Sequence, residues 1–328
     1  MSFTDLILLF IALLSGLIVG TMYGFAINKF HLFPYDLIKK LVKRLKNETL
    51  YGPWSIGLYS GTEAFGLSDA TAVSNPIITW QDVNDIEAEF VADPFFVLEA
   101  GKYYLFFEVL NRSTNLGDIA YATSADGIHW EYQKVILDEG FHLSYPYVFK
   151  WENEYYMIPE THEDLSVRLY KAAAFPEKWE HIGNLLEGYH FTDASIFRYD
   201  DKWWLFVSNT HNDVLNLYYS DDLLTGWLSH PSNPVMKLNQ HLSRPAGRVV
   251  VDGDKVYRFA QDDFPSYGIH VYAFEVTELT ETTYQEKMVM EEPFLFPTGT
   301  GWNAAGMHHI DLQKIGEQWI ATVDGRDK

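Results

Sequence analysis

Polar residues that could act on a sugar stand at matched positions of five similar apolar runs of this sequence. The runs begin ADPFFV, SYPYVF, TDASIF, SRPAGR and MHHIDL, and they recur about every 50 residues. A second, aromatic run follows each of them and also ends in a polar residue. The matched residues of the first runs are Asp93, Tyr145, Asp193, Arg244 and His308. Those of the second runs are Glu108, Glu160, Ser208, Gln261 and Asp324.

Carboxylates dominate these two sets, and paired carboxylates are the groups that cleave glycosidic bonds as base and acid. Crowding of like charges raises the pKa of a carboxyl group, as a proton donor requires. Aromatic residues could stack on sugar rings, although core packing between repeats is the alternative for each of them. The candidates are Tyr145, Tyr147, Trp302 and Tyr267.

Two further patterns carry weaker chemistry. Arg244 and Arg248 would share a face of an extended segment and clamp a phosphate or carboxylate, or else form buried ion pairs with acidic neighbours. His308 and His309 would alternate along a strand, so only one could face the centre. A metal would need more ligands, such as His142, His162 and His190. We expect no metal and no cofactor, since GxGxxG, P-loop, GxSxG and HExxH motifs are all missing from the sequence.

The elements that position these residues are short strands. Each repeat begins with a hairpin. In the first three repeats a third run follows, and it ends in a turn and a tryptophan. A fourth edge strand would complete each unit. A period near 50 with several strands per unit is typical of a propeller. The fifth repeat has two runs, and residues 52–80 supply the missing strands. The sequence predicts an all-β, five-bladed β-propeller over residues 51–328.

The composition excludes several classes of function. The net charge is −21, which disfavours binding to the phosphate backbone of a nucleic acid. No cysteine is present, so disulfides, thiolate nucleophiles and cysteine-bound metals are excluded. Aromatic residues make up 16% of the chain, and they fit the pleated surface of strands.

The first fifty residues differ from the rest. Residues 6–27 carry no charge and are long enough at helical rise to cross the ~30 Å core of a bilayer. We predict a transmembrane anchor over residues 1–28; a cleaved signal peptide is the alternative, but no basic residue precedes the run. Residues 29–50 form a predicted basic amphipathic helix on anionic lipid, or a solvated linker helix.

The charges around the anchor predict its orientation. No lysine or arginine precedes the apolar run, whereas six follow it closely: Lys29, Lys39, Lys40, Lys43, Arg44 and Lys46. Because basic residues stay on the cytoplasmic side, we expect a single-pass membrane protein with its N-terminus outside and its propeller in the cytoplasm.

The motifs resemble a known family. DPFFVLEAGKYYLFFEVLN, with SYPYVF, MIPETHE, RPAGR, FAQD and GMHH, is similar to the N-terminal propeller domain of plant glucosamine inositolphosphorylceramide transferases and its bacterial relatives. More distantly, the same residues resemble five-bladed glycoside hydrolases of the family 43 type. The resemblance covers about residues 80–328 and implies a role in polysaccharide or glycolipid metabolism. In the plant family the transferase chemistry belongs to a separate C-terminal domain, so the resemblance does not by itself imply transfer.

The resemblance also implies roles for single residues. Asp93 matches the general base of family 43, and Asp193 matches the aspartate that orients the acid and tunes its pKa. The acid itself is a glutamate where this sequence has Arg244, which cannot donate a proton at neutral pH. Glu160, Glu108 or Asp262 would then supply the acid, with Glu160 preferred.

Three functions follow. The first is cleavage or transfer of a glycosyl group by Asp93, Asp193 and Glu160. The second is a non-catalytic glycan or glycolipid module that assists a membrane glycosyltransferase. The third is an interaction scaffold. The substrate would contact Glu108, Tyr145, Arg244, Arg248, Gln261, Asp262, His308 and His309.

Overall fold

The computed structural model describes residues 52–70 and 72–328. The predicted anchor (1–28) and juxtamembrane helix (29–50) lie outside the described residues, so both stay predictions. Within the described part of the chain, no helix is long and apolar enough to cross a membrane.

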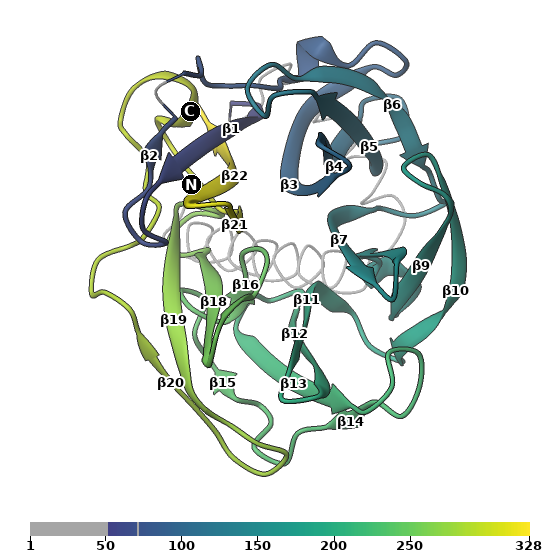
Figure 1. The fold of residues 1–328 in the computed structure, drawn as a ribbon, viewed down its shortest axis with the longest axis vertical. Coiled ribbons are helices and arrows are strands. Elements are labelled where there is room, and N and C mark those ends of the chain that lie inside the picture. The colour runs from purple at the N-terminus through teal and green to yellow at the C-terminus, as the bar shows by residue number, and fades with distance from the viewer. Residues whose placement is uncertain (1–51, 71) are drawn as a thin grey trace, which may run out of the picture. The chain divides into compact units, whose positions relative to one another are not determined.

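Five antiparallel sheets surround a common axis and form the predicted five-bladed propeller (Figure 1). Blade 1 contains β3 (Ala88–Glu99), β4 (Lys102–Asn111), β5 (Leu116–Ser124) and β6 (Glu131–Leu137). Blade 2 contains β7 (Ser144–Trp151), β8 (Glu154–Glu160), β9 (Ser166–Ala174) and β10 (Lys178–Glu187). Blade 3 contains β11 (Phe191–Tyr199), β12 (Lys202–Asn209), β13 (Val214–Ser220), β14 (Leu228–Ser229) and β15 (Met236–Lys237).

The last two blades are less regular. Blade 4 contains β16 (Arg244–Pro245), β17 (Val250–Asp252), β18 (Lys255–Asp262), β19 (His270–Leu279) and β20 (Tyr284–Met288). Blade 5 contains β21 (Ile310–Ile315), β22 (Gln318–Arg326), β1 (Trp54–Gly61) and β2 (Ser68–Asp69). Three short 3-10 helices lie between strands: η1 (Trp80–Asp82), η2 (His162–Asp164) and η3 (Gly301–Asn303).

Blade 5 joins the two ends of the described chain. Strand β1 pairs with β22 along its whole length, from Trp54 opposite Arg326 to Gly61 opposite Trp319. The expectation that residues 52–80 complete the fifth repeat is therefore confirmed. This pairing removes the open edges that an unclosed ring would expose.

The inner strands β3, β7, β11, β16 and β21 line the axis, as Figure 1 shows. Aromatic side chains fill the space between blades, and several are fully buried: Phe95, Phe96, Tyr145, Tyr147, Trp204 and Phe206. Burial of such rings is the main stabilising contribution that this packing makes. For Tyr145 and Tyr147, the structure favours core packing over stacking on a sugar.

A distortion recurs in the inner strands of the first three blades. Asp93, Tyr145 and Asp193 have φ angles of 54°, 48° and 47°, a left-handed conformation that is uncommon for residues other than glycine. At each of them the pairing with the second strand shifts register, which marks a β-bulge. These are the matched positions of the sequence repeats, so the repeat encodes the same bulge three times.

Candidate functional site

The bulges turn backbone N–H groups toward carboxylates near the axis. Asp93 donates its N–H to Asp324 Oδ2 at 3.1 Å, and Tyr145 donates to Asp93 Oδ2 at 3.2 Å. Asp193 donates to Glu160 Oε2 at 3.2 Å. Each of these bonds crosses from one blade to another. The two matched sets of polar residues therefore meet at the axis, as their spacing suggests.

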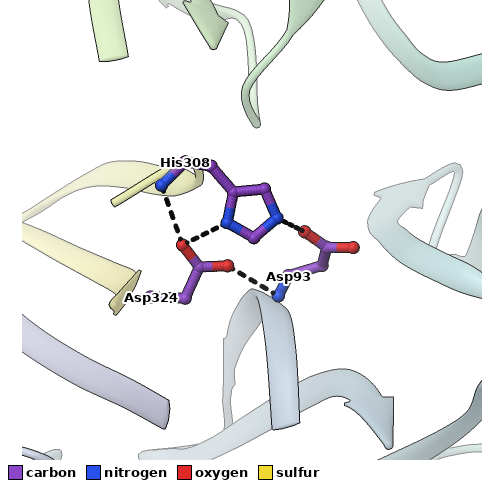
Figure 2. A group of neighbouring side chains, drawn as sticks. All are labelled: Asp93, His308 and Asp324. Carbon is purple, nitrogen blue, oxygen red and sulfur yellow. Dashed lines mark hydrogen bonds and ion pairs between the residues drawn. The ribbon is translucent and has the colours of Figure 1, made fainter. Parts of the chain in front are cut away.

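One part of this site is a histidine between two aspartates, shown in Figure 2. His308 Nδ1 lies 2.8 Å from Asp324 Oδ1, and His308 Nε2 lies 3.4 Å from Asp93 Oδ1. All three side chains are buried. Burial raises the pKa of Asp93 to about 6, although the charge of His308 opposes this. Burial would lower the pKa of His308, but the charge of Asp324 raises it above its ordinary value.

Within the described part of the chain, Asp93, His308 and Asp324 are also close enough together to bind a metal ion. One ligand atom from each of Asp93, His308 and Asp324 lies within 4.8 Å of the others. However, His308 already directs both ring nitrogens at the two carboxylates. The group is thus satisfied by its own contacts, and the expectation of no metal stays a prediction.

A second part of the site is built around Arg244. Its Nε lies 2.6 Å from Asp193 Oδ2, and its Nη2 reaches Asp193 Oδ1 at 3.2 Å and Glu160 Oε2 at 3.3 Å. Gln261 Nε2 also donates to Asp193 Oδ2 at 2.9 Å. His162 Nδ1 lies 2.8 Å from the other oxygen of Glu160. Arg244 therefore forms buried ion pairs with two carboxylates. Of the two roles that the sequence left open, this is the buried ion pair and not the clamp for a ligand.

The protonation of this second part follows from its contacts. Burial would raise the pKa of Glu160, but the bond to His162 and the charge of Arg244 hold it well below its usual range. Hydrogen bonding to Glu160 raises the pKa of His162. Burial raises the pKa of Asp193, and the guanidinium of Arg244 opposes that rise. Glu160 therefore carries a negative charge at neutral pH.

A third carboxyl group, that of Glu108, has no such cation bonded to it. Glu108 is buried, and His142 Nε2 lies 3.4 Å from its Oε1. Burial, and then the charge of Asp93, raise the pKa of Glu108 well above its ordinary value. Burial lowers the pKa of His142, so this imidazole is neutral at neutral pH. The surroundings of Glu108 therefore favour its protonated form, whereas those of Glu160 favour the ionised form.

Arg248 and Arg244 do not form one clamp. Arg248 Nε lies 2.5 Å from Asp311 Oδ1, and its Nη2 donates to the carbonyl of Val148 at 2.8 Å. The inner strand of blade 4 is interrupted between β16 and β17, where Gly247 has a φ angle of 134° and forms an isolated parallel bridge with Ile310. The segment is therefore not extended throughout, and each arginine reaches a different carboxylate.

Two other predicted substrate contacts have structural partners, and a third, Gln261, has them only in part. The Tyr145 hydroxyl lies 2.7 Å from Ser195 Oγ and donates to the carbonyl of Gly247 at 2.9 Å. Asp262 is held by two histidines of its own blade, His241 at 2.8 Å and His270 at 3.5 Å. Gln261 Oε1 is buried without a hydrogen-bond partner in the described chain.

His309 differs from its expected placement. Residues 308 and 309 precede β21 and do not alternate across a strand, so both rings approach Asp93 Oδ1, at 3.4 Å and 3.7 Å. His309 Nε2 lies 3.1 Å from the carbonyl of Pro94 and therefore carries the ring proton. Burial lowers the pKa of His309 to about 3. Its Nδ1 makes no hydrogen bond within the described residues.

The sequence suggested His142 and His162 only as possible metal ligands and did not place them beside the two glutamates. His142 precedes β7, and His162 belongs to η2 immediately after β8. Neither belongs to the matched positions of the repeat, so spacing alone did not place them at the axis. Tyr267, named as a stacking candidate, is 38% exposed, and its ring lies 5.3 Å from His308 and 5.5 Å from the guanidinium of Arg244.

Residues 47–326 match the family described as "Glucosamine inositolphosphorylceramide transferase 1, N-terminal". This chain belongs to that family. Glucosamine inositolphosphorylceramide transferase 1 of Oryza sativa subsp. japonica is 36% identical over 300 residues, and that of Arabidopsis thaliana is 31% identical over 301 residues. Each alignment covers 84% of this chain, but only 40% and 39% of the respective relatives. The chain thus spans about two fifths of their length.

Solved structures of glycoside hydrolases share the fold. The catalytic domain of a family 62 α-L-arabinofuranosidase from Coprinopsis cinerea has a TM-score of 0.57 at 13% identity, covering 84% of this chain and 97% of that one. An exo-1,5-α-L-arabinanase from a bovine ruminal metagenomic library has a TM-score of 0.52 at 15% identity, covering 74% of this chain and 90% of that one. At such identity the likeness establishes the propeller architecture alone.

Proposed function

We propose that this chain binds the glycan part of a glycolipid at the propeller axis and cleaves or transfers a glycosyl group there. The names of its relatives in glycolipid metabolism support the substrate class. The observation that carries the chemistry is the contrast between two buried carboxyl groups of blade 1. The pKa of Asp93 is raised only to about 6, while that of Glu108 is raised well above the ordinary range.

Each group thus has the protonation state that its role requires at neutral pH. Glu108 donates its proton to the oxygen of the leaving group as the glycosidic bond breaks. Asp93 accepts a proton from the attacking hydroxyl, which belongs to water in hydrolysis and to an acceptor in transfer. Glu160, preferred from the sequence as the acid, is ionised between His162 and Arg244, so we assign the acid to Glu108 instead.

Glycosyl release from a glycosyl inositolphosphorylceramide, followed by mass spectrometry, tests this proposal on the detergent-solubilised full chain. Asp93→Asn and Glu108→Gln should each lower turnover by a factor of about 10² to 10⁴, the usual contribution of a general acid or base. Lys255→Gln, on an exposed strand end, is the matched control. Turnover that survives both site substitutions would overturn the assignment.

A non-catalytic binding module is the second candidate. Arg244 supports it, because an arginine stands where family 43 enzymes have their acid, and its guanidinium is already bonded to Asp193, Glu160 and Asn212. Such a module would present a glycolipid to a membrane glycosyltransferase. Glycolipid binding to the wild type without turnover, unchanged in Glu108→Gln, would favour this function over the first.

We also propose that residues 1–28 anchor the chain, with residues 29–50 on the bilayer surface and the propeller in the cytoplasm. The absence of cysteine from the sequence makes single-cysteine labelling direct. In intact cells, a membrane-impermeant maleimide should label Ser2→Cys. It should label Asp254→Cys, at an exposed position, only after permeabilisation. The reverse pattern would place the propeller outside.

A further inference from the structure

The contacts of His142 determine where its ring proton lies. His142 Nδ1 accepts a hydrogen bond from the backbone N–H of Gly117 at 2.9 Å. A nitrogen that accepts such a bond carries no proton, so the neutral ring must carry its proton on Nε2. That nitrogen is the one that lies 3.4 Å from Glu108 Oε1. Gly117 therefore selects the tautomer that faces the proposed acid.

Gly117 permits this arrangement because it has no side chain. A Cβ atom at this position would lie 2.7 Å from Glu108 Oε1, 2.9 Å from His142 Cε1 and 2.1 Å from the carbonyl oxygen of Leu143. All three distances are shorter than real Cβ contacts. A side chain at residue 117 would thus separate the carboxyl group from the imidazole.

We infer that His142 is a positioning residue: its neutral ring, fixed as the Nε2–H tautomer by Gly117, faces Glu108 Oε1 and so leaves the carboxyl proton on Oε2. This inference rests on the proposed role of Glu108 as proton donor. An Nε2–H group can face a bare oxygen but not a second O–H group without a clash of hydrogens. The acidic proton consequently has one defined position from which it is donated.

Charged and titratable groups surround His142. Glu163 Oε2 accepts the backbone N–H of His142 at 3.0 Å, and the ring of His162 lies 6.2 Å away. The charges of Glu160 and Glu163 favour a protonated imidazole, while burial, His162 and Arg244 disfavour it. A second proton on the ring would also break the bond from Gly117, because it would have to sit on Nδ1.

The test is nitrogen NMR of the full chain labelled with ¹⁵N-histidine, with His142→Gln used to assign the signals. We expect the His142 ring to show an unprotonated Nδ1 and a protonated Nε2 at neutral pH. In Gly117→Ala that signature should be lost, while the signals of His308 and His309 report that the fold is intact. A proton on Nδ1, or on both nitrogens, in the wild type would overturn the inference.

Turnover provides a second readout. His142→Gln retains a neutral acceptor and a donor, so we expect it to lower turnover less than His142→Leu does. His142→Leu loses both and should lower turnover roughly tenfold, the order seen for lost orienting partners. Equal turnover of both variants would overturn the inference, whereas the proposed function fails if turnover survives both Asp93→Asn and Glu108→Gln. The two failures are therefore distinguishable.

Discussion

Blades 1 and 2 place a glutamate at the same point of the second strand, opposite the residue that precedes the bulge, and surround it with groups that favour opposite protonation states. Glu160 in blade 2 is bonded to His162 and Arg244, and it is ionised. Glu108 in blade 1 faces His142, whose pKa is lowered by burial, and burial and nearby charges favour the protonated form of Glu108 by raising its pKa. A repeated backbone position thus supplies a place for a carboxyl group, while its neighbours decide its chemistry.

The largest effect is expected from removing the cation of blade 4. Arg244→Met would leave the buried carboxylates of Asp193 and Glu160 without their guanidinium. Breaking a buried ion pair by removing one partner typically costs 3–5 kcal/mol, so we expect about 4 kcal/mol less stability at neutral pH. Chemical denaturation of the full chain in detergent measures this.

The control for that substitution is Arg244→Lys, which keeps the charge and loses the two-point contact. We expect it to lose less than half as much stability as the methionine variant. If both variants matched the wild type, Glu160 would not depend on Arg244 for its charge, and the contrast with Glu108 would need another cause.

Asp93, which acts electrostatically on Glu108, should give the next largest effect through pH. Its raised pKa means that the folded protein binds the proton more tightly than the unfolded chain, so this stability is lost as pH rises through about 6. The difference between 3.8 and about 6 corresponds to about 3 kcal/mol. Asp93→Asn lacks this loss.

Denaturation curves of the wild type and Asp93→Asn from acidic to mildly alkaline pH check that sign. The variant should gain about 3 kcal/mol relative to the wild type across the range. A constant difference between the two proteins would mean that Asp93 titrates normally and is not subject to the crowding at the axis.

The same substitution at the two matched glutamates tests the comparison most directly. Glu108→Gln replaces a carboxyl group that takes up a proton on folding at neutral pH by an amide of the same shape, so stability at neutral pH should rise rather than fall. Glu160→Gln removes a charge that binds His162 and Arg244, and it should cost about 2 kcal/mol at neutral pH. Equal losses would show that the two glutamates share one protonation state.

The sequence was sufficient for the fold because the period, the turn residues and the paired runs are local patterns that survive in a single chain. The ring closure by residues 52–80 followed from counting strands in the last repeat. For the site, the sequence suggested which residues to consider but not how they pair or which of them are protonated. Which carboxylate pairs with Arg244 depends on the break at Gly247, and the protonation of Glu108 depends on His142, which lies in a connection outside the repeat. The spacing of residues along the sequence does not indicate such contacts between blades.

The smallest effect separates the two histidines. His162 has a raised pKa, so its stabilising contact with Glu160 is present below an ordinary pKa of about 6.5 and is lost as pH rises through the folded value. His162→Gln should therefore cost about 1 kcal/mol in mild acid and little in alkali. His142 has a lowered pKa, so the wild type loses stability on acidification, and His142→Gln should gain relative to it as pH falls. The two variants should therefore differ from the wild type in opposite directions as pH falls. If both instead lost stability, or both gained it, the two glutamates would not differ as their neighbours suggest.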